Sequence, residues 1–180
     1  MRYRFSLLVV VICVAHLGCG RVQAGPEESN STTVAVSIAP SIAVVAWPDS
    51  FLAMASDVVP GKEVTSSALA VSVKANSPWG IEISCDLPDG RMKEFDRGVG
   101  AYVSNAALLT HPLQWSLSPS GPWQAVSSIP SSIVPSQPPT DNNGESVEFY
   151  LRLVADYGDR PLEEGRDYRI LLRYTAGLTY

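Results

Sequence analysis

The chain has 180 residues and carries 18 acidic against 13 basic side chains, a formal net charge of −5 at pH 7. Three of the arginines fall within the first 24 residues, so the rest of the chain holds 10 Lys and Arg and a formal charge of −8. This balance disfavours nucleic acid and anionic lipid as partners, because both need a basic surface that releases counterions. The length that remains suits one domain with a single core.

The first 24 residues are typical of a secretory signal peptide. Arg2 and Arg4 precede an apolar run at 7–15, and small residues stand at the −3 and −1 positions of a cleavage site that ends at Ala24. The apolar run is too short for a permanent membrane-spanning helix, and no later run is long enough to predict one. We therefore expect a protein outside the cytoplasm, either secreted or at the surface of the cell envelope.

Cys19 offers a second route to the cell surface. The sequence His16-Leu17-Gly18-Cys19 resembles a bacterial lipobox, in which the cysteine becomes the lipidated first residue. Gly18 fits that pattern, whereas leucine is usual where His16 stands. Free secretion and lipid anchoring through Cys19 both stay open, and in either case the polar residues 25–32 are expected to form a flexible lead-in.

From Thr33 onward, apolar and polar side chains alternate with a period of two, as in half-buried β-strands. The alternating segments are 34–38, 42–44, 69–75, 81–85, 113–117, 147–153 and 168–174. Turn-forming pairs separate them: Pro60-Gly61, Asp89-Gly90, Asn143-Gly144, Gly158-Asp159 and Glu164-Gly165. About seven antiparallel strands predict an all-β, Ig-like β-sandwich over 33–176 with a tail at 177–180, and a closed barrel is the second choice.

Two stretches interrupt the pattern. The segment 118–146 holds six prolines and many serines, and because proline cannot donate to a β-ladder we expect mostly loop or edge there. A loop of this length is often functional or mobile. The charged stretch 91–100 also reads as irregular, and 105–110 could form one short helix.

The residue types that enzymes use are sparse. His111 is the one histidine after residue 24, it stands before a proline at a strand start, and no Gly-x-Ser-x-Gly sequence accompanies it. Cys85 continues the alternation of 81–85, which indicates a small core side chain. His111 and Cys85 together cannot supply a zinc site. We therefore predict no catalytic residue, no enzyme activity and no cofactor.

Acidic residues cluster only in predicted turns. The pairs are Asp86 with Asp89, Asp156 with Asp159, and Glu163 with Glu164. Such residues usually bond their own backbone. Oxygen-bearing side chains at 141–143 could attract calcium, but the following glycine comes too early for an EF-hand loop, so we expect a hairpin turn and no metal.

Four tryptophans raise the question of carbohydrate binding, since flat rings stack on sugars. Trp115 alternates with core residues, and Trp79 and Trp47 stand at strand ends, so we expect these three to pack. Trp123, inside 118–146, is the candidate binding residue.

Several short motifs resemble small secreted β-sandwich domains of bacterial and archaeal cell-surface proteins. They are Pro60-Gly61, Leu69–Ala75, Asn76-Ser77-Pro78-Trp79 and the segment 165–170. Trp115-Ser116-Leu117 is also similar to one Trp-x-Leu element of the WxL cell-wall-binding domains, although the second such element near the C-terminus is absent. The resemblance implies a β-sandwich at the cell surface.

Together these observations predict a non-catalytic, structural or adhesive cell-surface protein that binds a polymer or protein of the envelope or extracellular space. One alternative is a carbohydrate-binding module that uses Trp123 and 118–146. Another is a pilus-like subunit that completes a neighbour's sheet with its N-terminal strand, residues 33–46.

Overall fold

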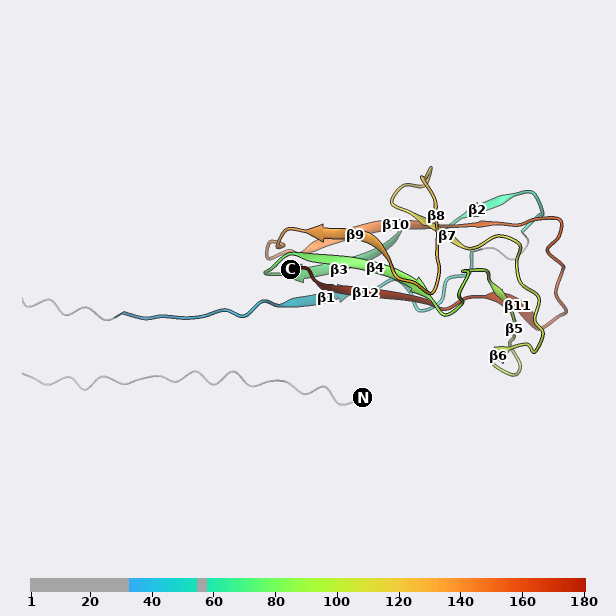
Figure 1. The fold of residues 1–180 in the computed structure, drawn as a ribbon, viewed down its shortest axis with the longest axis horizontal. Coiled ribbons are helices and arrows are strands. Elements are labelled where there is room, and N and C mark those ends of the chain that lie inside the picture. Colours follow the sequence, from blue (N-terminus) through green and yellow to red (C-terminus); the bar gives the residue numbers. More distant parts are fainter. Residues whose placement is uncertain (1–32, 55–57) are drawn as a thin grey trace, which may run out of the picture. The chain divides into compact units, whose positions relative to one another are not determined.

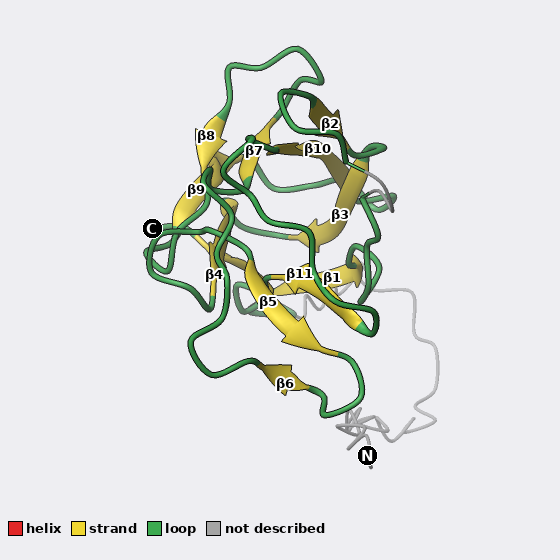
Figure 2. Cartoon of the chain, turned by 90° about the vertical axis from the view of Figure 1, so that its right-hand side faces the viewer, coloured by secondary structure: helices red, strands yellow, loops and turns green. Residues whose placement is uncertain are grey.

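The computed structural model describes residues 33–54 and 58–180. The predicted signal peptide, Cys19 and the lead-in at 25–32 lie outside the described residues. The chain divides into two units, 1–37 and 38–180. The second unit is all-β, with twelve strands in antiparallel sheets, and Figure 2 shows strands and loops but no helix in the described chain.

The largest sheet contains six strands. Its order is β1 (Ile42–Ala46), β3 (Leu69–Ala75), β10 (Glu145–Val154), β7 (Gln114–Ser116) and β8 (Gln124–Ala125), and β2 (Glu63–Thr65) also pairs with β10. Every strand pairing in this sheet is antiparallel. The predicted antiparallel sandwich class is confirmed.

β2 and β3 act as one interrupted strand along β10. Ser66 lies in the break, where its N–H donates to the Leu151 carbonyl at 2.8 Å. The Leu151 N–H in turn donates to the Ser66 hydroxyl at 3.0 Å. Both backbone polar groups of Leu151 therefore stay hydrogen-bonded at the gap between β2 and β3.

The other two sheets have three strands each. One has the order β12 (Leu172–Leu178), β4 (Trp79–Cys85) and β9 (Ser131–Gln137), and the other β11 (Arg166–Arg169), β5 (Lys93–Asp96) and β6 (Ala101–Tyr102). Figure 1 shows β5, β6 and β11 at one end of the sandwich, the end toward which β4 runs. β12 continues two residues beyond the expected boundary at 176.

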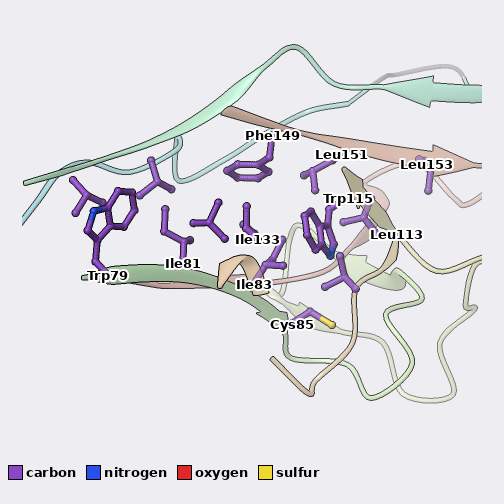
Figure 3. Close-up of a cluster of buried hydrophobic side chains, with 14 of the residues drawn as sticks. Trp79, Ile81, Ile83, Cys85, Leu113, Trp115, Ile133, Phe149, Leu151 and Leu153 are labelled. Carbon is purple, nitrogen blue, oxygen red and sulfur yellow. The ribbon is translucent and has the colours of Figure 1, made fainter. Parts of the chain in front are cut away.

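The core lies between the six-stranded sheet and the β12–β4–β9 sheet. Figure 3 shows Phe149 and Leu151 of β10 facing Ile81 and Ile83 of β4. The other fully or almost fully buried apolar side chains include Val71, Val73, Trp79, Leu113, Trp115, Val126 and Ile133. Val71, Val73, Leu113 and Trp115 are positions at which the period-two pattern placed inward apolar residues. Val126 and Ile133 instead lie in 118–146, where no alternation was seen.

Several predicted elements are wrong. Residues 34–38 pair with no strand, and no helix forms at 105–110. The single strand expected at 168–174 is divided into β11 and β12, because Leu171 leaves the ladder and its N–H donates to Asp86 at 3.0 Å. The stretch 91–100, expected to be irregular, contains β5. The expectation of loop or edge for 118–146 is confirmed, because β8 and β9 are both edge strands. Pro135 is tolerated in β9 because that strand is an edge.

Candidate functional site

The first described residues, 33–39, carry alternating apolar side chains and no proline or charge; we call them the N-terminal arm. Val34, Val36 and Ile38 are 88, 87 and 78 % exposed. The alternation typical of a strand is therefore present without a strand partner. Residues 42–46, by contrast, pair with β3 as β1. Of the segment predicted to complete a neighbour's sheet, residues 33–46, this part is therefore already paired.

Asn76 fixes the point at which the arm joins the sandwich. Its side-chain amide donates to the Ala39 carbonyl at 2.9 Å, and its side-chain oxygen accepts the Ser41 N–H at 2.6 Å. The backbone N–H of Asn76 also donates to the Ser41 carbonyl at 3.1 Å. Three hydrogen bonds from one residue thus hold both sides of Pro40.

Large apolar side chains continue to be exposed along and after β1. Val45 sits in a register shift between Val44 and Ala46, so it bulges away from β3. Trp47 lies one residue beyond the strand and is 48 % exposed, and Phe51 is also exposed. The expectation that Trp47 packs in the core is wrong, because the edge strand ends before it. We call Val45, Trp47 and Phe51 the apolar strip.

Arg169 of β11 lies against the last of these rings. Its guanidinium is 5.5 Å from the centre of the Phe51 ring and 4.3 Å from that of Phe95. It donates to both oxygens of Asp167 at 2.6 and 2.9 Å, and this pairing raises the pKa of Arg169. The Asp167 carboxylate therefore orients a cation that supports Phe51 without burying it.

A buried carboxylate organises the β11–β5–β6 sheet. Glu94 of β5 is 1 % exposed and accepts hydrogen bonds from the Ala107 N–H at 3.0 Å, from Arg166 at 2.7 Å and from Arg160 at 2.8 Å. The Ala107 N–H contributes most, and with the two arginines it outweighs the opposing effect of burial and lowers the pKa of Glu94 to about 2. Glu94 thus connects β5 to β11, through Arg166, and to the loops that contain Ala107 and Arg160.

Other carboxylates in the predicted turns also serve the backbone. Asp159 accepts the N–H and the hydroxyl of Thr110, both at 2.7 Å, and the Asp156 N–H at 2.8 Å. Burial opposes ionisation, yet the hydrogen bonds from Asp156 and Thr110 lower the pKa of Asp159. His111 Nε2 lies 3.3 Å from Asp156, at the surface. The pair Asp156 and Asp159 is thus joined to the 110–111 segment.

The carboxylates of the first acidic pair, Asp86 and Asp89, accept hydrogen bonds from side chains. Asp86 accepts the Tyr102 hydroxyl at 2.8 Å, and Asp89 accepts the Arg91 side chain at 2.6 Å. Burial, together with the bond to Asp86, raises the pKa of Tyr102. In the third pair, Glu163 lies 3.3 Å from Arg166.

Trp123, the predicted binding residue, is half-buried and already stacked. The Arg152 guanidinium lies 4.8 Å from its ring centre and donates to Gln114 at 2.9 and 2.7 Å and to Glu63 at 2.9 Å. One face of the indole is therefore covered by the protein itself. Trp79 and Trp115 are buried, as predicted.

The remaining predicted residues take local roles. Cys85 is a buried free thiol, as predicted; burial raises its pKa, and Sγ donates to the Leu87 carbonyl at 3.0 Å. Asp141 accepts the N–H groups of Asn143 and Gly144 at 2.8 and 3.1 Å, which closes the turn before β10. Within the described residues, no group of three or more His, Cys, Asp or Glu could hold a metal ion.

Two shallow grooves mark the β12–β4–β9 sheet. One, of about 200 Å³, has the facing glycines Gly80 and Gly177 in its floor, beside Glu82 and Thr175. The other, of about 220 Å³, lies where β7 approaches β9; its lining includes Trp115, Leu117, Pro122, Gln124 and Ser132.

Sequence reasoning missed Glu94, Arg160 and the exposure of the apolar strip. Glu94 shares the alternation of Met92, so a strand at 92–96 would place it inward. Its burial is acceptable because the Ala107 N–H and two distant arginines donate to its carboxylate. The exposure of Trp47 had a weaker signal, Pro48, which ends the strand directly behind it.

Comparison with protein-family models, with curated proteins and with solved structures finds no match. The part of the chain that the structure describes contains no helix able to cross a bilayer.

Proposed function

We propose that the protein is a non-catalytic structural or adhesive β-sandwich outside the cytoplasm, secreted or lipid-anchored, that contacts a polymer or protein of the cell envelope through the apolar strip. The observation that carries this proposal is the exposure of three large apolar side chains close together in the sequence: Val45 in the edge strand β1, and Trp47 and Phe51 directly after it. Aromatic side chains that stay exposed on a rigid edge are typical of contact surfaces.

The hydrogen bonds of three charged side chains also support a structural role. Glu94, Asp159 and Arg152 each make several hydrogen bonds within the domain. These bonds tie loops and strands into a stiff support, and a stiff support lowers the entropic cost of presenting a binding edge.

The experiment measures how much purified processed protein is retained on envelope preparations from its producing cells. We expect the double variant Trp47→Ser/Phe51→Ser to lose at least about tenfold in affinity, since central aromatic contacts dominate binding. Tyr157→Ser is the control, because Tyr157 is an aromatic residue in another loop and is even more exposed than Trp47 and Phe51. Unchanged retention of the double variant would refute the role of the strip.

The carbohydrate-binding alternative is favoured by one observation, the groove between β7 and β9. Ser116, Ser118 and Gln124 line it beside Pro122 and Leu117, and hydroxyl and amide groups around an apolar floor suit a saccharide. Trp123 does not line this groove, and Arg152 covers one face of its ring.

A further inference from the structure

We propose that the N-terminal arm of one copy adds as a strand to the free edge of β12 in a second copy. This inference rests on the proposed structural role and names one partner for it, the same chain. The arm, Thr-Val-Ala-Val-Ser-Ile-Ala, is rich in strand-forming residues and holds no charge or proline. Such segments pair readily with an available strand edge.

β12 offers the best free edge of the sandwich. It is seven residues long, pairs with β4 on one side only and contains neither proline nor a register shift. The other long edge strand, β9, is interrupted by Pro135 and by two register shifts, and β1 is shortened by the bulge at Val45. Among the described strands, β12 therefore lacks the features that usually block edge pairing.

The core is also incompletely covered next to this edge. On β4, the inward-facing Ile81, Ile83 and Cys85 are buried. On β12, the apolar side chains Tyr174, Ala176 and Leu178 reach the core but remain half-buried. Tyr174 contacts Phe149, with ring centres 5.4 Å apart.

Across the sandwich, Ile42 and Val44 of β1 are half-buried in the same way. We call the five half-buried side chains Ile42, Val44, Tyr174, Ala176 and Leu178 the β1–β12 seam. The seam and the arm are complementary in spacing. Val34, Val36 and Ile38 occupy every second position, as do Tyr174, Ala176 and Leu178.

A strand added at β12 would therefore place three apolar side chains over the seam while its backbone pairs with the β12 edge. The three side chains that are most exposed in the arm would leave water in the same step.

The contact is head-to-tail, because the arm of one copy meets β12 of another. Such contacts do not satisfy both surfaces in a dimer unless the copies swap arms, so open chains of copies are expected at high concentration. Asn76 supports this arrangement by holding Ala39 and Ser41, so that the arm leaves each sandwich at a fixed place.

Sedimentation of the processed protein over a range of concentrations tests the proposal. We expect concentration-dependent growth in mass for the natural sequence. Association should fall at least about 100-fold when residues 33–39 are deleted or Val36→Asp is introduced. Ile129→Asp, at an exposed isoleucine far from both surfaces in sequence, is the control and should associate like the natural protein.

Mixing gives the sharper result. Val36→Asp leaves β12 able to receive an arm, and Ala176→Glu leaves the arm able to add; Leu178→Glu, near the strand end, replaces the second variant if it does not fold. Each variant alone should stay monomeric, and the mixture should form one-to-one heterodimers. A natural protein that is monomeric throughout, or an arm variant that associates unchanged, overturns the proposal.

The two hypotheses fail separately. Val36→Asp should keep its retention on envelope material, whereas Trp47→Ser/Phe51→Ser should keep self-association. If one folded variant lost both envelope retention and self-association, the arm and the apolar strip could not be two separate contact surfaces.

Discussion

Asn76 and Ser41 exchange two hydrogen bonds: the Ser41 N–H donates to the Asn76 side-chain oxygen at 2.6 Å, and the Asn76 N–H donates to the Ser41 carbonyl at 3.1 Å. The same side chain holds the Ala39 carbonyl. The start of β1 is therefore fixed by a residue in the turn after β3.

Asn76→Ala should cost about 1 kcal/mol of unfolding free energy, because exposed hydrogen bonds contribute modestly. It should also speed amide exchange at Ser41 more than at central positions of β3. Asn142→Ala, in another exposed turn, is the comparison. Equal exchange at Ser41 in both variants would contradict a clamp at Asn76.

The Glu94 cluster predicts a defined pH dependence. The pKa of Glu94 is about 2 in the folded protein against an ordinary value of 4.5, so its ionised form stabilises the fold above about pH 4.5. That contribution is lost as the pH falls through 4.5 toward 2. Urea denaturation should show Glu94→Gln to be the less stable protein at pH 7, with the difference shrinking toward pH 2. The control Glu148→Gln, at an exposed position on β10, should have the same unfolding free energy as the natural protein at each pH. A stability difference between Glu94→Gln and the natural protein that did not change with pH would contradict this prediction.

Two tryptophan substitutions separate core from surface. Trp79 is buried and its Nε1–H donates to the Pro138 carbonyl at 2.9 Å. Trp79→Phe should lower the unfolding free energy by about 2 kcal/mol, through a small cavity and an unpaired carbonyl. Trp47→Phe should change it by less than about 0.5 kcal/mol. Chemical denaturation of both variants measures the contrast, and equal losses would contradict the assigned positions.

Two glycines should respond in opposite ways to alanine. Gly90 has a φ of 68°, and an added Cβ would overlap the Val126 carbonyl oxygen. Gly90→Ala should therefore destabilise the domain by about 3 kcal/mol or more. At Gly177, in β12, an added Cβ meets no atom within 4 Å, so Gly177→Ala should be neutral or stabilise by up to about 1 kcal/mol. Thermal unfolding of the two variants provides the check.

Trp123→Ala distinguishes the two proposed binding surfaces. We expect a loss of about 1 kcal/mol in stability, from the contact with Arg152, and unchanged retention on envelope material. Retention on insoluble polysaccharide that disappears with Trp123→Ala would instead support carbohydrate binding through Trp123 and the segment 118–146.

Much of the fold could be predicted because alternation reports which face of a strand is buried. It identified β3 and β10 and the inward positions Trp115 and Cys85. It failed at 34–38, because alternation shows that a strand can form and not whether a partner strand is available. It also missed β5, since Glu94 looks polar in sequence and its partners Arg160 and Arg166 lie more than sixty residues away.

The candidate site was less predictable for a related reason. Trp123 was favoured because it lies among prolines and serines, but a cation from β10 covers it. Trp47 was assigned to the core because it follows an apolar strand, yet β1 is an edge and ends before it. The exposure of Trp47 and the cation over Trp123 both depend on the tertiary arrangement, which a local pattern does not reveal.

Hydrogen exchange of the purified protein, with and without envelope material from its producing cells, tests the proposed contact surface most directly. Slower exchange confined to the backbone of residues 45–52, with the loops around Glu94 unchanged, is the result expected if this edge is the adhesive surface. Protection centred on residues 115–124, with 45–52 exchanging as in the free protein, would contradict it.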